Sequence, residues 1–192
     1  MRAMLLLAGP ALMIASAASA GEQAELACIQ KGYSAEQKAE VDSLVGKVDV
    51  IGESNDPALE SLGTLVMSVA TGCGTQYGWT DPEAGSALLY EFGRLMELGF
   101  RRSGKLTNAE IARIDTALGK GDREALRDAL EDQIAQGMGG DVETVDEANA
   151  EIFGNFILEL GIGTDGGKPE QIGVYLAAKA MQRASARNFT SQ

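Results

Sequence analysis

Signals for the start of an α-helix recur along this chain. A Ser or Thr followed three residues later by Glu or Gln can form a capping box, in which the two side chains satisfy backbone N–H groups of the first helical turn. Such pairs are Ser34 with Gln37, Thr80 with Glu83, Thr107 with Glu110, and Thr144 with Glu147. Apolar residues then recur at helical spacing, whereas no segment sustains the alternation of a half-buried strand. We predict an all-α fold, a bundle of about seven or eight helices.

The expected helices cover most of the chain after residue 20. A short helix spans about 22–31, and others begin near Ser34, Pro57, Thr80, Thr107, Asp122, Thr144 and Pro169. The helix from Pro57 is expected to end at Gly72-Cys73-Gly74, because glycine is a common helix stop. The helix from Thr144 carries a broad apolar face, so we expect it to run through the centre of the fold.

The helix that begins at Thr80 has the clearest pattern. One apolar stripe comprises Leu88, Leu89, Phe92, Leu95, Met96, Gly99 and Phe100. The charged residues between them are Glu91, Arg94, Glu97 and Arg101. At helical spacing these charged side chains are expected to lie largely off the stripe.

The first twenty residues indicate export. Arg2 places a positive charge at the start, residues 3–20 carry no charge, and Ala18-Ser19-Ala20 offers small residues for a cut before Gly21. We therefore predict a signal peptide at residues 1–20 and a single helical domain at residues 21–192, located in the periplasm or secreted.

Two other interpretations of the N-terminal segment are less consistent with its residues. A membrane anchor would need an uninterrupted apolar span, but Gly9-Pro10 breaks the run and acidic Glu22 and Glu25 follow it. A lipid-modified Cys28 would need an apolar or small residue three positions earlier, where Glu25 stands. We expect no transmembrane segment after processing.

Composition excludes several kinds of site. The chain has no histidine, so Ser-His and Cys-His catalytic pairs and histidine metal sites are impossible. The net charge is −12, which disfavours binding to nucleic acid. Cys28 and Cys73 are the only cysteines, and in an exported chain one pair most economically forms a disulfide. We expect no metal and no cofactor.

Four glycines stand inside apolar helical stretches, where each costs about 1 kcal/mol relative to alanine. They are Gly63, Gly93, Gly154 and Gly173. Close helix crossing is the favoured explanation, because a missing side chain lets a neighbouring backbone approach. The functional alternative is clearance for a bound apolar ligand.

Two features are candidates for binding a partner. Tyr77 and Trp79 form an aromatic pair next to the expected disulfide, and such aromatics anchor interfaces, although they also close the ends of helical bundles. A basic segment spans residues 101–127 in an otherwise acidic chain, and its alternative is a solvated surface. The candidate binding residues are Tyr77, Trp79, Arg101, Arg102, Arg123 and Arg127.

The acidic stretch around residue 147 is a candidate for a different chemistry. Its carboxylates are Asp141, Glu143, Asp146, Glu147 and Glu151. Glu147 and Glu151 share a helical face, and paired carboxylates can bind Ca²⁺ or cleave glycosides. Acidic residues are equally typical of a helix start, where they favour the helix dipole.

These observations favour an exported protein that binds another macromolecule, either a protein or an anionic component of the cell envelope. The alternatives are a carboxylate-dependent hydrolase of cell-wall glycan and a carrier of small apolar ligands. Two acidic side chains that converge in one cleft would favour the hydrolase. An enclosed cavity beside the helical glycines would favour the carrier. The sequence identifies neither the partner nor the oligomeric state.

Overall fold

A computed structural model describes residues 21–47, 57–139, 147–163 and 165–192 of the chain. Within these ranges the protein is all-α, as predicted, with eight α-helices and no strand. The elements are η1 (Gln23–Leu26), α1 (Ala27–Gly32), α2 (Ala35–Leu44), α3 (Pro57–Tyr77), α4 (Asp81–Ser103), α5 (Asn108–Leu118), α6 (Glu124–Gly139), α7 (Glu147–Leu160), η2 (Asp165–Gly167) and α8 (Lys168–Thr190). None of these described helices combines the length and apolar character needed to cross a membrane.

Three of the predicted capping boxes are present. Both reciprocal hydrogen bonds form between Ser34 and Gln37 at α2. They also form between Thr80 and Glu83 at α4, and between Thr107 and Glu110 at α5. The expected box at Thr144 and the predicted signal peptide lie outside the described residues. Local side-chain chemistry therefore determines where these three helices begin.

The end of α3 differs from the prediction. The helix continues through Gly72 and Gly74 to Tyr77 and ends at Gly78, whose φ is +72°. The backbone N–H groups of Gly78 and Trp79 both donate to the carbonyl oxygen of Gly74, at 2.8 and 3.0 Å. Glycine inside a helix keeps helical dihedral angles at a modest cost, whereas the left-handed conformation of Gly78 stops the helix.

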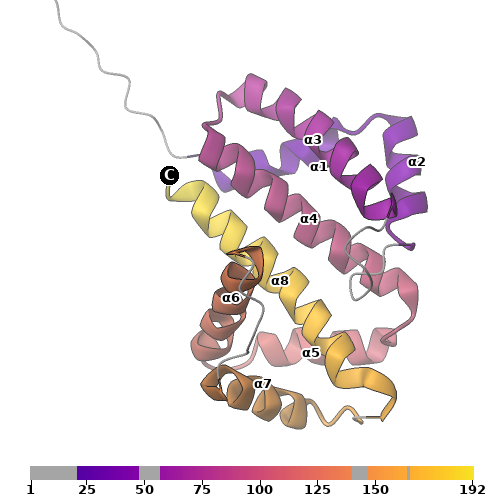
Figure 1. Ribbon diagram of the computed structural model, residues 1–192, viewed down its shortest axis with the longest axis vertical. Helices are drawn as coiled ribbons and strands as arrows, with labels where there is room; N and C mark the ends of the chain where they lie inside the picture. Colours follow the sequence, from indigo (N-terminus) through magenta and orange to yellow (C-terminus); the bar gives the residue numbers. More distant parts are fainter. Residues whose placement is uncertain (1–20, 48–56, 140–146, 164) are drawn as a thin grey trace, which may run out of the picture.

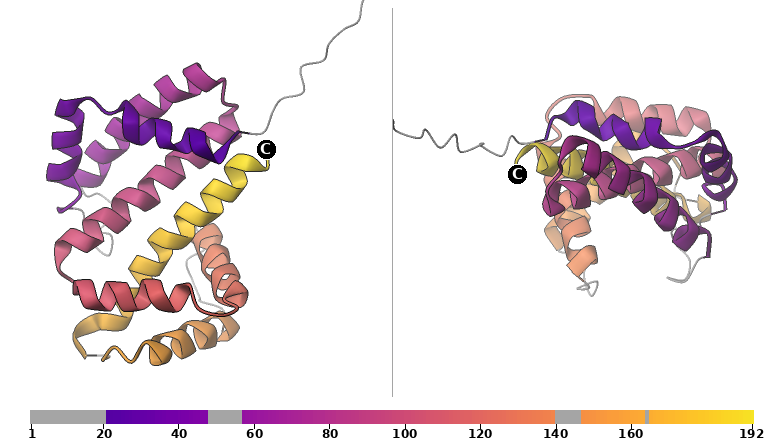
Figure 2. Two further views of the ribbon diagram at one scale, coloured as in Figure 1. Left: turned by 180° about the vertical axis from the view of Figure 1, so that it is seen from behind. Right: turned by 90° about the horizontal axis from the view of Figure 1, so that it is seen from above.

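The two longest helices form the centre of the molecule. α4 makes its most extensive contact with α8, and the two run antiparallel (Figure 1). α1, α2 and α3 lie along one side of this pair, while α5, α6 and α7 lie along the other (Figures 1 and 2). The expectation that the helix from Thr144 runs through the centre is wrong. α7 packs mainly on α6 and α5 at the periphery, and its Leu158 is 73% exposed.

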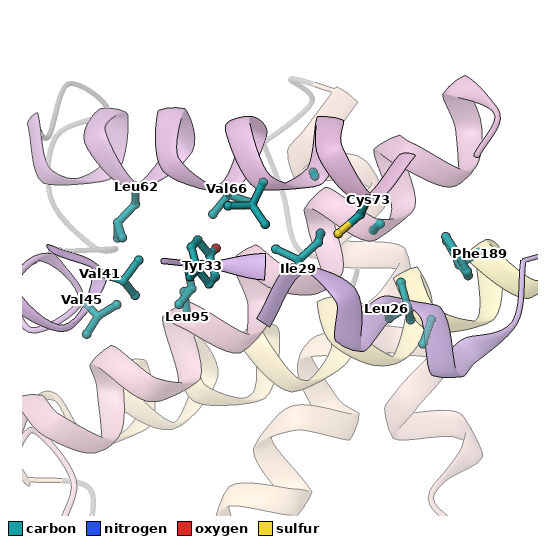
Figure 3. Packing of buried hydrophobic residues seen from close by; sticks show 14 residues of the cluster. Leu26, Ile29, Tyr33, Val41, Val45, Leu62, Val66, Cys73, Leu95 and Phe189 are labelled. Carbon is teal, nitrogen blue, oxygen red and sulfur yellow. The ribbon is translucent and has the colours of Figure 1, made fainter. Parts of the chain in front are cut away.

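The core divides into two clusters, one on each side of the central pair. The first joins η1, α1, α2 and α3 to α4 and the end of α8, and Ile29, Val66 and Phe189 are fully buried in it (Figure 3). The predicted disulfide between Cys28 and Cys73 is present and connects α1 to α3. The second cluster joins α5, α6 and α7 to α8 around Tyr175.

One residue of α4 departs from the expected pattern. Glu91, which was expected off the apolar stripe, is fully buried. Its carboxylate accepts hydrogen bonds from the hydroxyl of Tyr33 at 3.1 Å and from the guanidinium of Arg94 at 2.6 and 2.7 Å. A helix packed against neighbours on more than one side buries part of its polar face, and the ion pair compensates for the desolvation of the carboxylate.

Candidate functional site

The aromatic pair lies in the turn between α3 and α4. Tyr77 is 46% exposed and stacks on Trp79, with ring centroids 6.2 Å apart. Trp79 is half-buried, meets the ring of Phe189 edge-on at 5.3 Å, and donates its indole N–H to Glu25 at 2.8 Å. The polar group of Trp79 is therefore used within the fold, whereas the Tyr77 ring faces solvent.

The predicted basic residues bind other parts of the same chain. Arg102 pairs with Asp42 at 2.9 Å, and Arg127 donates to the carbonyl oxygen of Leu118 at 3.3 Å. Arg123 pairs with Glu159 and lies over the ring of Phe156. These contacts join helices and cap their ends, so each of these arginines has a structural role within the fold.

The structure does not bring the two predicted features together. Trp79 packs against the first core cluster, and Arg123 packs over Phe156 of the second. Their role in binding stays a prediction.

A charge network around Tyr175 was not anticipated from the sequence. The buried Tyr175 hydroxyl donates to Asp115 at 2.9 Å and accepts a hydrogen bond from Arg101 at 2.7 Å. Lys179 pairs with Glu97 at 2.8 Å, and Arg101 also pairs with Glu97 at 2.8 Å. The network joins α4, α5 and α8.

Ionisation within the network is strongly biased. Burial and the hydrogen bond to Asp115 raise the pKa of Tyr175, so its hydroxyl stays protonated. Burial raises the pKa of Glu97, but hydrogen bonds from Lys179, Gln182 and Arg101 outweigh this effect and hold the pKa below its usual value. Glu97 and Asp115 are two converging carboxylates, yet both are paired with cations between helices. This arrangement holds the three helices together.

The acidic stretch shows no comparable convergence. Glu147 and Glu151 are both exposed at the beginning of α7. Asp141, Glu143 and Asp146 lie outside the described residues. In the part of the chain that the structure describes, no group of three or more carboxylate or thiol side chains is placed to hold a metal ion.

The helical glycines serve different purposes. At Gly93 an added Cβ would lie 2.9 Å from the carbonyl oxygen of Ala178, so close helix crossing is confirmed there. At Gly63 the nearest atom is 3.6 Å away, on the ring of Phe92, which is ordinary contact. At Gly154 and Gly173 an added Cβ would meet no described atom within 4 Å. For these two glycines the packing explanation is wrong, because no described neighbour makes van der Waals contact at the Cβ position.

An apolar groove of about 380 Å³ lies beside Gly173, between α6, α7 and α8. Its apolar lining includes Ile134, Phe153, Ile157, Gly173, Val174 and Ala177. Gln133 and Glu170 are the polar residues that line it. This volume is in the range of ligand-binding pockets, and the mixture of an apolar surface with few polar groups is typical of them.

A second, smaller hollow shares one lining residue with the groove. It holds about 30 Å³ between α2, α3, α4 and α8, and Val174 lines both hollows. Leu59, Phe92 and Met96 are among its other lining residues.

The sequence carried one signal for this site. Gly173 inside an apolar helix indicated either close packing or clearance, and the structure shows clearance. The residues that α6 and α7 contribute carry no local signal, because their convergence depends on the tertiary fold. Searches of protein-family models, curated proteins and solved structures found no match to this chain.

Proposed function

We propose that this protein is exported and binds an amphipathic helix of a partner protein in the groove beside Gly173. The observation that carries the proposal is the apolar groove itself, which is lined by the exposed Gly173 of α8. Amphipathic helices commonly bind by placing their apolar face in such grooves. The disulfide supports export, because such bonds persist in oxidising compartments.

The shape of the site favours a helix as the occupant. Gly173 and Ala177 lie one turn apart on α8 and present no side chain larger than a methyl group. Small residues at this spacing let a second helix approach closely.

Charge favours a basic partner. The chain has a net charge of −12, and Glu170 supplies a carboxylate at the groove. Opposite charge on a partner helix would accelerate association and orient the complex. Arg102, Arg123 and Arg127 each contact another part of the same chain, so they give less support to an anionic partner.

A carrier of small apolar ligands is less well supported. Such a carrier was expected to enclose its ligand, but Gly173 on the groove floor is exposed among the described residues. A drug-sized ligand generally buries most of its surface in its pocket. An open groove leaves one side of its occupant uncovered, which suits the apolar face of a helix.

The test uses a fluorescein-labelled synthetic helix of leucine and lysine, with its leucines on one face. We expect fluorescence polarisation to detect binding with a Kd below about 1 mM, which corresponds to a favourable binding free energy of at least about 4 kcal/mol. Gly173→Leu should weaken binding at least about tenfold, because its side chain fills the groove. Gly72→Leu is the matched control, since Gly72 is also exposed inside a helix with no described atom within 4 Å of its Cβ position.

Two further probes separate the alternatives. A peptide with the same lysines but serines in place of the leucines reports charge attraction alone, and it should bind at least about tenfold more weakly. Dodecanoate reports a small apolar ligand, and saturable competition by dodecanoate at low micromolar concentration would instead support the carrier. Equal binding of the leucine peptide by the Gly173→Leu and Gly72→Leu variants, or no binding by the unmodified protein, would contradict the proposal.

A further inference from the structure

Gly21, the residue after the predicted cleavage site, is anchored to a position far along the chain. Its backbone nitrogen donates a hydrogen bond to Oε1 of Glu83 at 2.9 Å. The other carboxylate oxygen of Glu83 accepts hydrogen bonds from the backbone N–H and the hydroxyl of Thr80, at 2.6 and 2.8 Å. Glu83 is only 5% exposed. One oxygen therefore caps α4 while the other faces the nitrogen of Gly21.

The surroundings of Gly21 leave no space for a side chain. A Cβ added there would overlap the ring of Phe189, near the end of α8. Phe189 is fully buried and meets Trp79 edge-on, and Figure 3 shows Phe189 next to Leu26 at this end of the cluster. Glycine at position 21 is thus required by packing, and the aromatic rings fix its position relative to Glu83.

Cleavage before Gly21 would change the chemistry of this contact. Hydrolysis breaks the bond between the carbonyl carbon of Ala20 and the nitrogen of Gly21. Water supplies the second oxygen of the new Ala20 carboxylate. Both of its hydrogens end on the Gly21 nitrogen: the first takes the place of the broken C–N bond, and the second binds as a proton. A neutral amide with one N–H then becomes an ammonium group with three, because an α-amino group has a pKa of about 7.7 to 8.0.

We propose that Glu83 and Phe189 form an internal binding site for the α-ammonium group of Gly21, which signal-peptide cleavage creates. The neutral hydrogen bond becomes a charge-assisted ion pair, and such bonds are about twice as strong as neutral ones. Removal of the leader therefore strengthens the attachment of η1 to α4 and α8. This inference rests on the predicted cleavage site and is independent of the groove.

The other charged groups near the site carry both signs. Glu22 and Glu25 follow Gly21, and Asp81 stands in the first turn of α4. From α8, the guanidinium of Arg187 is paired with Glu131. The positive end of the α4 dipole opposes an ammonium group, but the Glu83 carboxylate lies between them and accepts the hydrogen bond directly.

The stability contributed by the pair of Gly21 and Glu83 should depend on pH, because the interaction requires an ionised carboxylate and a protonated amine. Hydrogen bonds from the Thr80 backbone and hydroxyl hold the pKa of Glu83 below its usual value, and the bond from Gly21 lowers it further, although burial opposes them. Glu83 is thus ionised at neutral pH. An ammonium paired with it has a folded-state pKa above the unfolded value. Its contribution to stability is complete below about pH 8 and is lost as the pH rises through the folded-state pKa.

The experiment uses the full chain, expressed with its leader in an export-competent bacterial host. Intact-mass measurement of the exported protein should show that it begins at Gly21. NMR titration of the Gly21 ¹³Cα shift should then give an α-amino pKa at least about one unit above 7.7 to 8.0, a tenfold tighter hold on the proton. Glu83→Gln should return it to the ordinary range, since glutamine preserves the capping box but removes the charge.

Two variants separate the specific pair from general acidity. Glu22→Gln removes the exposed neighbouring carboxylate and should change the pKa of the amino group by less than half as much as Glu83→Gln. Gly21→Ala keeps a small residue for cleavage, but its methyl group should displace the amine from Glu83 and lower the pKa similarly. A different N-terminus, equal values in the unmodified and Glu83→Gln proteins, or equal effects of Glu22→Gln and Glu83→Gln would overturn the proposal.

Discussion

A Cβ atom placed on Gly93 of α4 would lie 2.9 Å from the carbonyl oxygen of Ala178 on α8. The backbone nitrogen of Gln182 is also close, at 3.1 Å. The two central helices therefore cross in near-contact between backbones, and both core clusters depend on this crossing.

Replacing glycine by alanine inside a helix usually stabilises it, but at this crossing we expect the opposite. Gly93→Ala should destabilise the protein by about 1 to 3 kcal/mol, because overpacking forces the two backbones apart. Gly85→Ala on the same helix has open space at its Cβ position and should stabilise by up to about 1 kcal/mol. Urea unfolding of both variants measures the difference. If both substitutions stabilise the protein, the helices do not cross this closely.

The disulfide should contribute substantially to stability. It joins Cys28 and Cys73 across a sequence separation of 45, for which the chain-entropy relation gives about 4 kcal/mol. Reduction of the folded protein, or the double variant Cys28→Ala/Cys73→Ala, should lower the free energy of unfolding by about 2 to 4 kcal/mol. Thiol titration of the denatured, unreduced protein gives an independent check. Two free thiols would rule out the bond.

Phe156 should be important for stability even though α7 is peripheral. Its side chain is 3% exposed in the second cluster, and the Arg123 guanidinium lies over its ring. Phe156→Ala should cost about 3 to 5 kcal/mol through lost burial and an unfilled cavity. Leu158→Ala on the same helix is the control and should change stability by less than about 0.5 kcal/mol. A loss below about 1 kcal/mol for Phe156→Ala would show that α7 contributes little to the core.

The capping glutamate of α5 should affect stability in acid. Hydrogen bonds from Lys168, at 2.6 Å, and from the Thr107 backbone and hydroxyl lower the pKa of Glu110 from 4.5 to about 2. Because the folded-state pKa is depressed, the contribution is present above about pH 4.5 and is lost as the pH falls toward 2.

Glu110→Gln keeps the capping geometry but removes this titration. Its free energy of unfolding should therefore decline less between pH 4.5 and pH 2 than that of the unmodified protein. Lys168→Gln should give an intermediate slope, because the Thr107 hydrogen bonds remain. Denaturant unfolding at intervals across this pH range measures the slopes, and identical slopes for all three proteins would exclude the depressed pKa.

Several properties could be predicted from the sequence because their causes are local or compositional. The capping boxes at Ser34, Thr80 and Thr107 join residues three positions apart, so the spacing alone specifies the hydrogen bonds. The pairing of Cys28 with Cys73 followed from the absence of any other cysteine. The lack of histidine likewise excludes histidine-dependent catalysis and metal binding, whatever fold the chain adopts.

Helix lengths and positions were less predictable. The glycines near Cys73 resembled a helix stop, but the positive φ of Gly78 decides where α3 ends. The broad apolar face around Phe156 suggested a central helix, yet α4 and α8 occupy the centre. An apolar face shows that a helix is covered on that face, but it does not identify which helix covers it.

What the sequence determined by itself was the all-α class, the helix starts at Ser34, Thr80 and Thr107, and the single disulfide, since each depends on neighbouring residues or on composition. Only the tertiary structure decided that Glu91 is buried, that Gly93 is a crossing point, and that Gly173 opens into a groove. The physical reason is that burial and clearance depend on residues distant in the chain. A periodic pattern describes one helix, whereas a groove requires the relative placement of three.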